Sequence, residues 1–410
     1  MIIKLKSENQ STREKNMKIG MVTPQDPRTG ISIYAAILSV ELKNLGEEVS
    51  IITPDNSSNQ LPVNLDDIKI ISPENYDADD YDVTHFQLAN SNLHEFQLHL
   101  LDKHSKKLKS NSNTITTVHD ARNFDSFNLK CSKCISFGIH LSDTPLIYPF
   151  DIVDRGFQRI SKYLIFHNKF ALNEYKNRYK LDNNYLKCIP ISAYRLNDTD
   201  HHKKVEIDQN ENRILVPGYI SPFKGQDILL EAVSKIDHDL KLIFMGKVVD
   251  EKYGVYLERL IEKEDIQDKV EFLGFVTDNE FVEEIEKAKV ILVPRLISSW
   301  MKERPIFKIR KLFGLDYLIT QSSSAVLTMS LAYGKPVICS ENKGFSQYIN
   351  SSRGILCDDS VDNWRNAINY LLENPTKLKE MSLNSKTFAN DTLNPNMIAK
   401  RHIKLYEECV

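Results

Sequence analysis

Residues 218–232 read GYISPFKGQDILLEA and join a short apolar run to a helical pattern. The apolar run, residues 213–217, has the composition of a buried strand, and apolar residues recur at helical spacing after the turn. Lys224 therefore lies where a helix begins, beside unpaired backbone N–H groups and the positive end of the helix dipole, and this combination can hold a phosphate. A lone lysine on such a turn is also commonly a solvated side chain, so both interpretations stay open at this point.

The stretch resembles the segment G-R-L-S-P-x-K-G-x-D-x-L-L-E-A of the retaining family-four glycosyltransferases (glycosyl transferases group 1), where it opens the C-terminal domain. In that family the lysine and the arginine before it hold the diphosphate of a nucleotide-sugar. The resemblance implies donor contacts at Gly218, Tyr219 and Lys224. Tyr219 stands at the arginine position, and a neutral phenol can donate one hydrogen bond but cannot neutralise a phosphate charge.

Composition bounds the class of protein. The chain has 410 residues, of which 41% are hydrophobic and 27% charged, with a formal net charge of −3. This length corresponds to about two to three domains, and the charge gives no reason to expect nucleic acid as a partner. No apolar run reaches the about 18 residues that would span a membrane, and residues 1–16 form a charged extension without the core of a signal peptide. We expect a cytoplasmic protein.

The six cysteines are mostly scattered, which is typical of reduced thiols in a cytoplasm. Cys131 and Cys134 have metal-ligand spacing, but zinc needs two further ligands, for which His119 and His140 are the nearest histidines. Two reduced thiols in a loop are the preferred interpretation, so we expect no metal.

The first half begins with a strand at residues 18–22, a helix after Gly30 and a second strand at residues 48–53. This βαβ pattern predicts a parallel sheet with a ligand crevice at the carboxyl edge of its strands. It resembles the family's opening P-x-x-G-G-x-x-x-Y. Thr29 replaces one of the two glycines, while Gly30 still permits the backbone to approach a substrate closely.

Two histidines end strands of this half. Residues 114–120 read TITTVHD, which resembles the family's T-x-H-D, and the resemblance implies that His119 contacts the donor sugar near the scissile bond as a catalytic residue. An imidazole there can give or take a hydrogen bond near neutral pH. His85 ends YDVTH, similar to the family's Y-D-V-V-H, and is either a packed neighbour of the cleft or a direct participant.

A long polar helix is expected at residues 92–109, with lysines in its last turns. Cations at a helix C-terminus interact favourably with the helix dipole, which accounts for them. In membrane-associated members of the family a basic helix of the N-terminal domain touches anionic lipid, so a weak surface contact is the alternative.

The second half repeats the βαβ rhythm and departs from the family in an insertion at residues 295–320. Residues 302–311 hold five basic side chains and one acidic one, interleaved with apolar and aromatic residues. An amphipathic basic stretch can lie on a membrane or bind an acidic partner through residues 296–319. It can equally pack as a lid on the cleft.

The family's motif E-x-F-G-x-x-x-x-E-A-x-A-x-G-x-P-V-I becomes QSSSAVLTMSLAYGKPVI at residues 321–338. Gln321 and Met329 thus replace both glutamates, of which the first lies near the transferred sugar and the second binds the ribose. The serine turn with Ser323, Ser324 and Ala325 can still present N–H groups to a phosphate.

The resemblance implies an α/β protein with the GT-B fold, in which two Rossmann-like doubly wound domains face each other across a cleft. We expect an N-terminal domain at residues 17–195, a linker at 196–212 and a donor domain at 213–392. A helix at residues 393–410 is expected to cross back to the N-terminal domain.

The first functional hypothesis is a retaining, metal-independent glycosyltransferase. Its substrates are a UDP- or GDP-sugar and a glycan, lipid-linked or protein acceptor, and no cofactor is expected. The second hypothesis is a catalytically inactive subunit that binds a partner protein, a glycan or the inner face of a membrane. A sugar epimerase or phosphorylase is a third option, and the oligomeric state is open.

Overall fold

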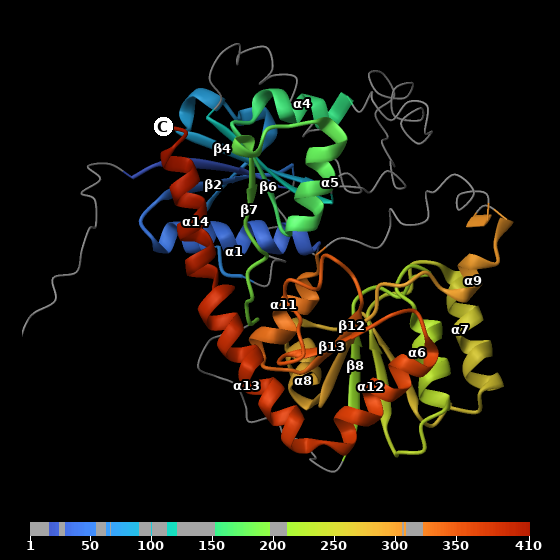
Figure 1. Ribbon diagram of the computed structural model, residues 1–410. Helices are drawn as coiled ribbons and strands as arrows, with labels where there is room; N and C mark the ends of the chain where they lie inside the picture. The colour runs from blue at the N-terminus through green and yellow to red at the C-terminus, as the bar shows by residue number, and fades with distance from the viewer. Residues whose placement is uncertain are drawn as a thin grey trace, which may run out of the picture.

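We describe the protein from a computed structural model. It describes residues 16–23, 29–54, 63–65, 67–89, 100, 113–120, 152–196, 211–305, 307–308 and 323–410. The chain forms two lobes, each built on one sheet with helices on both faces, and the described strands all pair in parallel (Figure 1). The α/β, GT-B-type architecture expected from the sequence is confirmed.

The N-terminal lobe has a seven-stranded sheet in the order β3-β2-β1-β4-β5-β6-β7. Its strands are β1 (Lys18–Val22), β2 (Glu48–Ile52), β3 (Lys69–Ile71), β4 (Val83–Ala89), β5 (Thr114–Asp120), β6 (Tyr163–Phe166) and β7 (Leu186–Cys188). Its helices are α1 (Gly30–Asn44), α4 (Ile152–Ile160) and α5 (Lys169–Tyr179), with short 3-10 turns η2 (Pro73–Asn75), η3 (Ala78–Asp80) and η6 (Asn183–Tyr185).

The C-terminal lobe has a six-stranded sheet in the order β10-β9-β8-β11-β12-β13. Its strands are β8 (Arg213–Pro217), β9 (Lys241–Met245), β10 (Val270–Gly274), β11 (Val290–Val293), β12 (Val337–Ser340) and β13 (Gly354–Cys357). Its helices are α6 (Gln226–Ser234), α7 (Glu251–Lys263), α8 (Asp278–Lys287), α9 (Ser299–Lys302), α11 (Ala325–Ala332), α12 (Val361–Glu373) and α13 (Pro375–Thr392).

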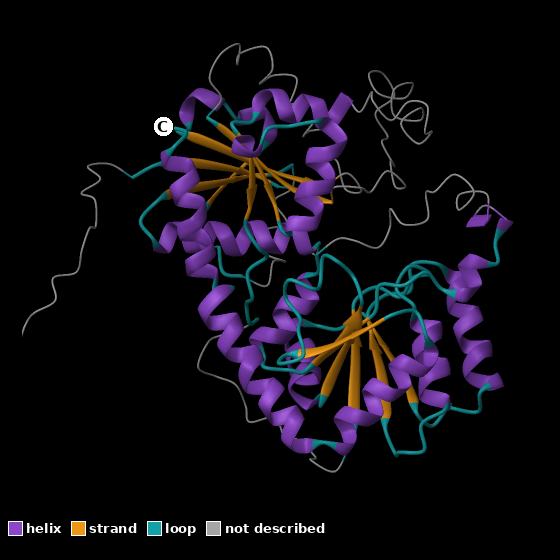
Figure 2. Ribbon diagram, viewed as in Figure 1, coloured by secondary structure: helices purple, strands orange, loops and turns teal. Residues whose placement is uncertain are grey.

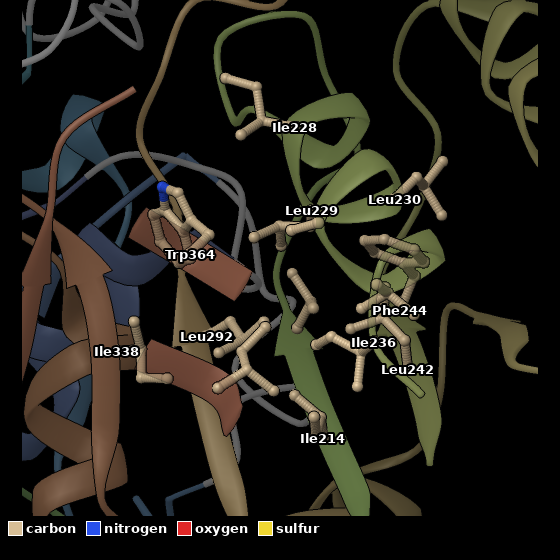
Figure 3. Packing of buried hydrophobic residues seen from close by; sticks show 14 of the residues in the cluster. Ile214, Ile228, Leu229, Leu230, Ile236, Leu242, Phe244, Leu292, Ile338 and Trp364 are labelled. Carbon is tan, nitrogen blue, oxygen red and sulfur yellow. The ribbon is translucent and has the colours of Figure 1, made fainter. Parts of the chain in front are cut away.

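Burial on both faces explains why the inner strands of the C-terminal lobe, β8, β9, β11 and β12, are largely apolar. Side chains alternate along β8, so that Ile214 and Val216 pack in the core that α6, α7 and α12 cover, while Leu215 packs in the opposite core with α8 and α11. Figure 3 shows the first core, where Leu229 of α6 and Trp364 of α12 lie against the sheet.

The last helix, α14 (Pro395–Glu407), leaves the C-terminal lobe and packs beside α1 on the N-terminal lobe (Figures 1 and 2). Its residues Ile398, Ala399 and Tyr406 belong to the same buried cluster as Tyr34 and Leu38 of α1. The side chains of Lys162 and Tyr163 donate hydrogen bonds to Glu408, which fixes the end of the chain on this lobe.

Two glycines let the turn after β8 form next to the end of β9. Gly218 has a φ of 113° and Gly246 a φ of 156°, and a Cβ on Gly246 would lie 2.2 Å from the carbonyl oxygen of Gly218. The backbones of the two turns therefore approach more closely than any side chain permits.

Replacement of Gly246 by alanine tests this close approach. Gly274 is a matched control, since it has a φ of 68° and a Cβ there would meet nothing within 4 Å. We expect Gly274→Ala to lower the free energy of unfolding by about 1–2 kcal/mol through backbone strain, and Gly246→Ala by about 1–3 kcal/mol more through the added clash. Denaturant unfolding measures both, and equal costs would contradict the packing described.

Candidate functional site

The turn between β8 and α6 places three of the expected donor contacts at the carboxyl edge of the C-terminal sheet. Tyr219 is 48% exposed, and its carbonyl oxygen accepts a hydrogen bond from Gln226. Lys224 is half-buried, and its backbone N–H donates to the carbonyl oxygen of Ser221 at 3.0 Å. Gly225, in the left-handed conformation with a φ of 61°, then begins α6. The lysine therefore stands at a helix start, as the sequence indicates.

The described part of the insertion packs against the same turn. The backbone N–H of Ser298 donates to the carbonyl oxygen of Pro222 at 2.8 Å, and that of Ser299 donates to Asp227 Oδ2 at 2.7 Å. Asp227 is buried and also accepts from the Tyr253 hydroxyl at 3.1 Å, and burial raises the pKa of its carboxyl group. These bonds hold α9 against α6 and α7.

Aromatic contacts strengthen this attachment. The ring centroid of Trp300 lies 5.6 Å from that of Tyr253, and the Arg304 guanidinium lies 4.1 Å from the Trp300 centroid. The start of the insertion is thus a packed segment. The basic stretch 302–311 is described at residues 302–305 and 307–308, whereas 306 and 309–322, Gln321 included, lie outside the described residues. The expected helix at 92–109 apart from Leu100 and the Cys131–Cys134 pair also lie outside them.

The serine turn begins α11 and contacts the N-terminal lobe. Ser324 is the N-cap of α11, and its side chain accepts from the N–H of Leu327. The Asn168 side chain, at the start of α5, donates to Ser323 Oγ at 2.8 Å across the two lobes. Ala325, the first residue of α11, lies close to Gly30, since a Cβ added to Gly30 would be 3.7 Å from Ala325 Cβ.

Gly30 is the first residue of α1, so the first turns of two long helices from opposite lobes lie together. Figure 1 shows this end of α1 next to α11. Each helix start carries unpaired N–H groups and about half a positive charge. Two positive helix ends at one place attract an anion more strongly than either does alone.

His119 ends β5 and uses both ring nitrogens inside the N-terminal lobe. Its Nε2 lies 2.9 Å from Gln87 Oε1 on β4, and its Nδ1 lies 3.0 Å from His167 Nε2 after β6. The Tyr34 ring of α1 meets it edge-on with centroids 5.3 Å apart. Burial, followed by the neighbouring His167 and His85, holds the pKa of His119 well below its usual value.

His85 is packed away from the surface of the site. It is fully buried, with its Nδ1 2.7 Å from the Tyr406 hydroxyl of α14 and its Nε2 2.7 Å from Thr117 Oγ1. Of the two interpretations offered by the sequence, these contacts favour the packed one.

Met329 lies in α11 at the position of the family's ribose-binding glutamate, and it is buried. It is 5% exposed and belongs to the apolar cluster that contains Leu327 and Leu331. Its side chain therefore contributes to the core of the C-terminal lobe.

Sequence reasoning assigned no role to His167, Gln87 or Asn168. The His167 carbonyl oxygen accepts from Gln347 Nε2 at 2.5 Å and from the Tyr348 hydroxyl at 2.9 Å, both of the C-terminal lobe. The local signal for Asn168 is its residue type, since asparagine is a good helix N-cap.

Comparison with known proteins gives a family match for one part of the chain. Residues 197–388 match the family model described as glycosyl transferases group 1. No curated protein matches the sequence of the chain. Within the described residues, no helix has the length and apolar composition needed to cross a membrane.

Solved structures resemble the whole chain. HepE of Anabaena, in complex with UDP and glucose, has a TM-score of 0.67 at 13% identity over 96% of this chain and 100% of that chain. A glycosyltransferase from Rickettsia africae has a TM-score of 0.69 at 16% identity, over 96% of this chain and 98% of that chain. Sucrose-phosphate synthase from Thermosynechococcus elongatus has a TM-score of 0.66 at 16% identity, over 96% of this chain and 99% of that chain. At these identities the likeness shows the fold.

The three buried histidines, His85, His167 and His402, and the half-buried His119 predict a loss of stability in acid. Burial holds the pKa values of His85 and His119 well below their usual range and lowers those of His167 and His402 to about 4. Because the unfolded chain binds protons more readily, stability is complete above about pH 6.5 and falls as the pH drops toward 4, by about 3 kcal/mol for a histidine shifted this far.

Thermal unfolding between pH 7.5 and 5 measures this loss. We expect His402→Gln to weaken the pH dependence, because it removes a fully buried imidazole. His238→Gln is the control, since His238 is partly exposed and pairs with Glu373 at the surface. Equal pH dependence in both variants would contradict the assignment.

Proposed function

We propose that this protein is a retaining glycosyltransferase, on the basis of its GT-B fold and of the match of residues 197–388 to the model of the glycosyl transferases group 1. It moves a sugar from a nucleotide-diphospho-sugar to a glycan, lipid or protein acceptor. The meeting of the first turns of α1 and α11, beside the Asn168–Ser323 hydrogen bond, carries the proposal. A diphosphate is the part of such a donor that two positive helix ends recognise.

Each residue of the site has a role in this proposal. Lys224 and the N–H groups at the start of α11 stabilise the charge of the leaving diphosphate, the work that a metal ion does in other enzymes. Gly30 and His119 approach the donor from the N-terminal lobe. The leaving diphosphate itself then serves as the base on the retained face of the sugar. UDP-sugars are the first donors to test, because HepE was crystallised in complex with UDP-glucose, and GDP-sugars are the second.

Replacing Lys224 tests the charge that the proposal needs. Lys224→Met keeps the length of the side chain and removes its cation, and we expect transfer to fall about a hundredfold or more, the usual effect of losing one group that stabilises transition-state charge. Lys235→Met, at the exposed other end of α6, is the control. Unchanged donor hydrolysis and transfer in Lys224→Met would refute the assignment.

Gly30→Ala separates function from folding. The added Cβ would lie 3.7 Å from Ala325 Cβ, an ordinary contact, so we expect stability within about 0.5 kcal/mol of the wild type. Donor affinity should fall about tenfold or more, because the methyl group keeps a phosphate from a backbone N–H. Calorimetric titration and thermal unfolding measure the two effects, and wild-type affinity would contradict the proposed contact.

A second function, a binding subunit without catalysis, is favoured by Tyr219 and Met329. The first puts an exposed neutral phenol where the family has an arginine, and the second is buried in the core where the family has a ribose-binding carboxylate. Calorimetry with UDP-, GDP- and ADP-sugars distinguishes the two. Binding of at least one supports the transferase, whereas binding of none at high protein concentration favours the subunit.

A further inference from the structure

His119 and His167 form a hydrogen-bonded pair whose two outer ends both meet acceptors. At one end, His167 Nδ1 lies 3.0 Å from the carbonyl oxygen of Ile189, and a carbonyl can only accept, so this nitrogen carries a proton. At the other end, His119 Nε2 lies 2.9 Å from Gln87 Oε1, which also requires a proton on nitrogen. A third proton lies between His119 Nδ1 and His167 Nε2, 3.0 Å apart.

Two neutral imidazoles carry two ring protons, while this chain of acceptors requires three. The arrangement therefore fits a pair that holds one positive charge. A neutral pair fits equally well after the Gln87 amide turns by half a rotation, because its NH2 group then donates to the unprotonated His119 Nε2. The amide of Gln87 thus has one orientation for each charge state.

The neighbours of Gln87 accommodate both orientations. Its Nε2 lies 3.2 Å from His85 Nε2, and His85 Nδ1 lies 2.7 Å from the Tyr406 hydroxyl. With the amide nitrogen toward His85, that ring accepts from Gln87 and donates to Tyr406. With the amide oxygen toward it, the His85 Nε2–H faces that oxygen, and Tyr406 donates its proton to Nδ1. The Gln87 amide nitrogen also lies 3.0 Å from Met21 Sδ, and the Thr117 hydroxyl, 2.7 Å from His85 Nε2, can donate to that nitrogen or accept from it.

The pair lies next to the two helix starts. The Tyr34 ring, one turn along α1 from Gly30, meets the rings of His119 and His167 with centroids 5.3 and 4.9 Å away. Asn168, the residue after His167, bonds Ser323 at the start of α11. Tyr34 and Asn168 therefore connect the two helix starts to the pair.

The titratable side chains described around the pair are histidines and tyrosines. These are His85 on β4, Tyr34 on α1, and His402 on α14, which contacts the Tyr34 hydroxyl at 3.3 Å. Tyr348 reaches the His167 carbonyl from the C-terminal lobe, and Asp120 follows His119 on β5. Burial in this surrounding lowers the pKa of both imidazoles, so the pair without an anion is neutral at neutral pH.

We propose that the His119–His167 pair takes up one proton from solvent when a diphosphate binds at the starts of α1 and α11. The proton completes the three-proton chain, Gln87 turns its oxygen to His119 Nε2, and the shared cation stabilises the bound diphosphate. The charge belongs to the pair and not to one ring. This inference rests on the proposed function, because it needs a diphosphate ligand at that place.

Calorimetric titration of the full-length protein with UDP-glucose and, in parallel, GDP-mannose tests the proposal. Both phosphates of these ligands are esterified, so each keeps one charge through the neutral range and proton uptake belongs to the protein. Titration at one pH in buffers of different ionisation enthalpy gives the number of protons taken up. We expect uptake approaching one proton per ligand. Affinity should rise by up to about tenfold per pH unit as the pH falls from the pKa of the pair in the complex to its pKa in the free protein.

Two variants of Gln87 distinguish this role from packing. Gln87→Met removes the acceptor for the third proton, and Gln87→Glu supplies a permanent anionic acceptor that charges the pair before binding, so both should reduce uptake to near zero. His238→Gln, at the surface, should keep the wild-type value, and thermal unfolding confirms that each variant is folded. Binding without proton uptake in the wild type, or full proton uptake in Gln87→Met, would contradict this inference and leave the proposed function standing. Absence of binding at every pH overturns it together with the proposed function.

Discussion

The structure depends on bringing two positive helix ends from separate lobes to one place. The first residues of α1 and α11 are near enough for a Cβ on Gly30 to contact Ala325, and the Asn168–Ser323 hydrogen bond fixes this approach. Like partial charges at such a distance repel, so the arrangement favours an anion at the two helix starts. Parallel sheets create this geometry, because the helices that follow their strands begin at the carboxyl edge.

His167 connects this contact to the interior of the N-terminal lobe. Its carbonyl oxygen accepts hydrogen bonds from Gln347 and Tyr348 of the other lobe, while its ring joins the chain through His119 to Gln87. His85 continues that chain to Tyr406 on α14, the helix that leaves the C-terminal lobe and packs beside α1. A change at the helix starts therefore reaches both the histidines and the helix that ties the lobes together.

The sequence predicts the fold well because the inner strands of its sheets are buried on both faces. The apolar run at residues 213–217 locates β8 at the observed bounds. Capping residues set where helices begin, as the capping box of Thr277 and Glu280 does for α8.

The candidate site is predicted less completely, because its contacts join residues far apart in the chain. Nothing local indicates that His119 and His167 share a proton position, or that Asn168 reaches Ser323. The motif register locates Met329, but the direction of its side chain follows from the packing of α11 in the core. An aromatic, basic insertion is equally compatible with a membrane and with a protein surface, and the partners of Trp300 decide this for the described part.

A crystal structure with a bound nucleotide-sugar tests the central claim most directly. The account predicts diphosphate oxygens within about 2.7–3.2 Å of backbone N–H groups at Gly30 and at the start of α11. A diphosphate bound elsewhere, with the contact between α1 and α11 unchanged, would contradict it.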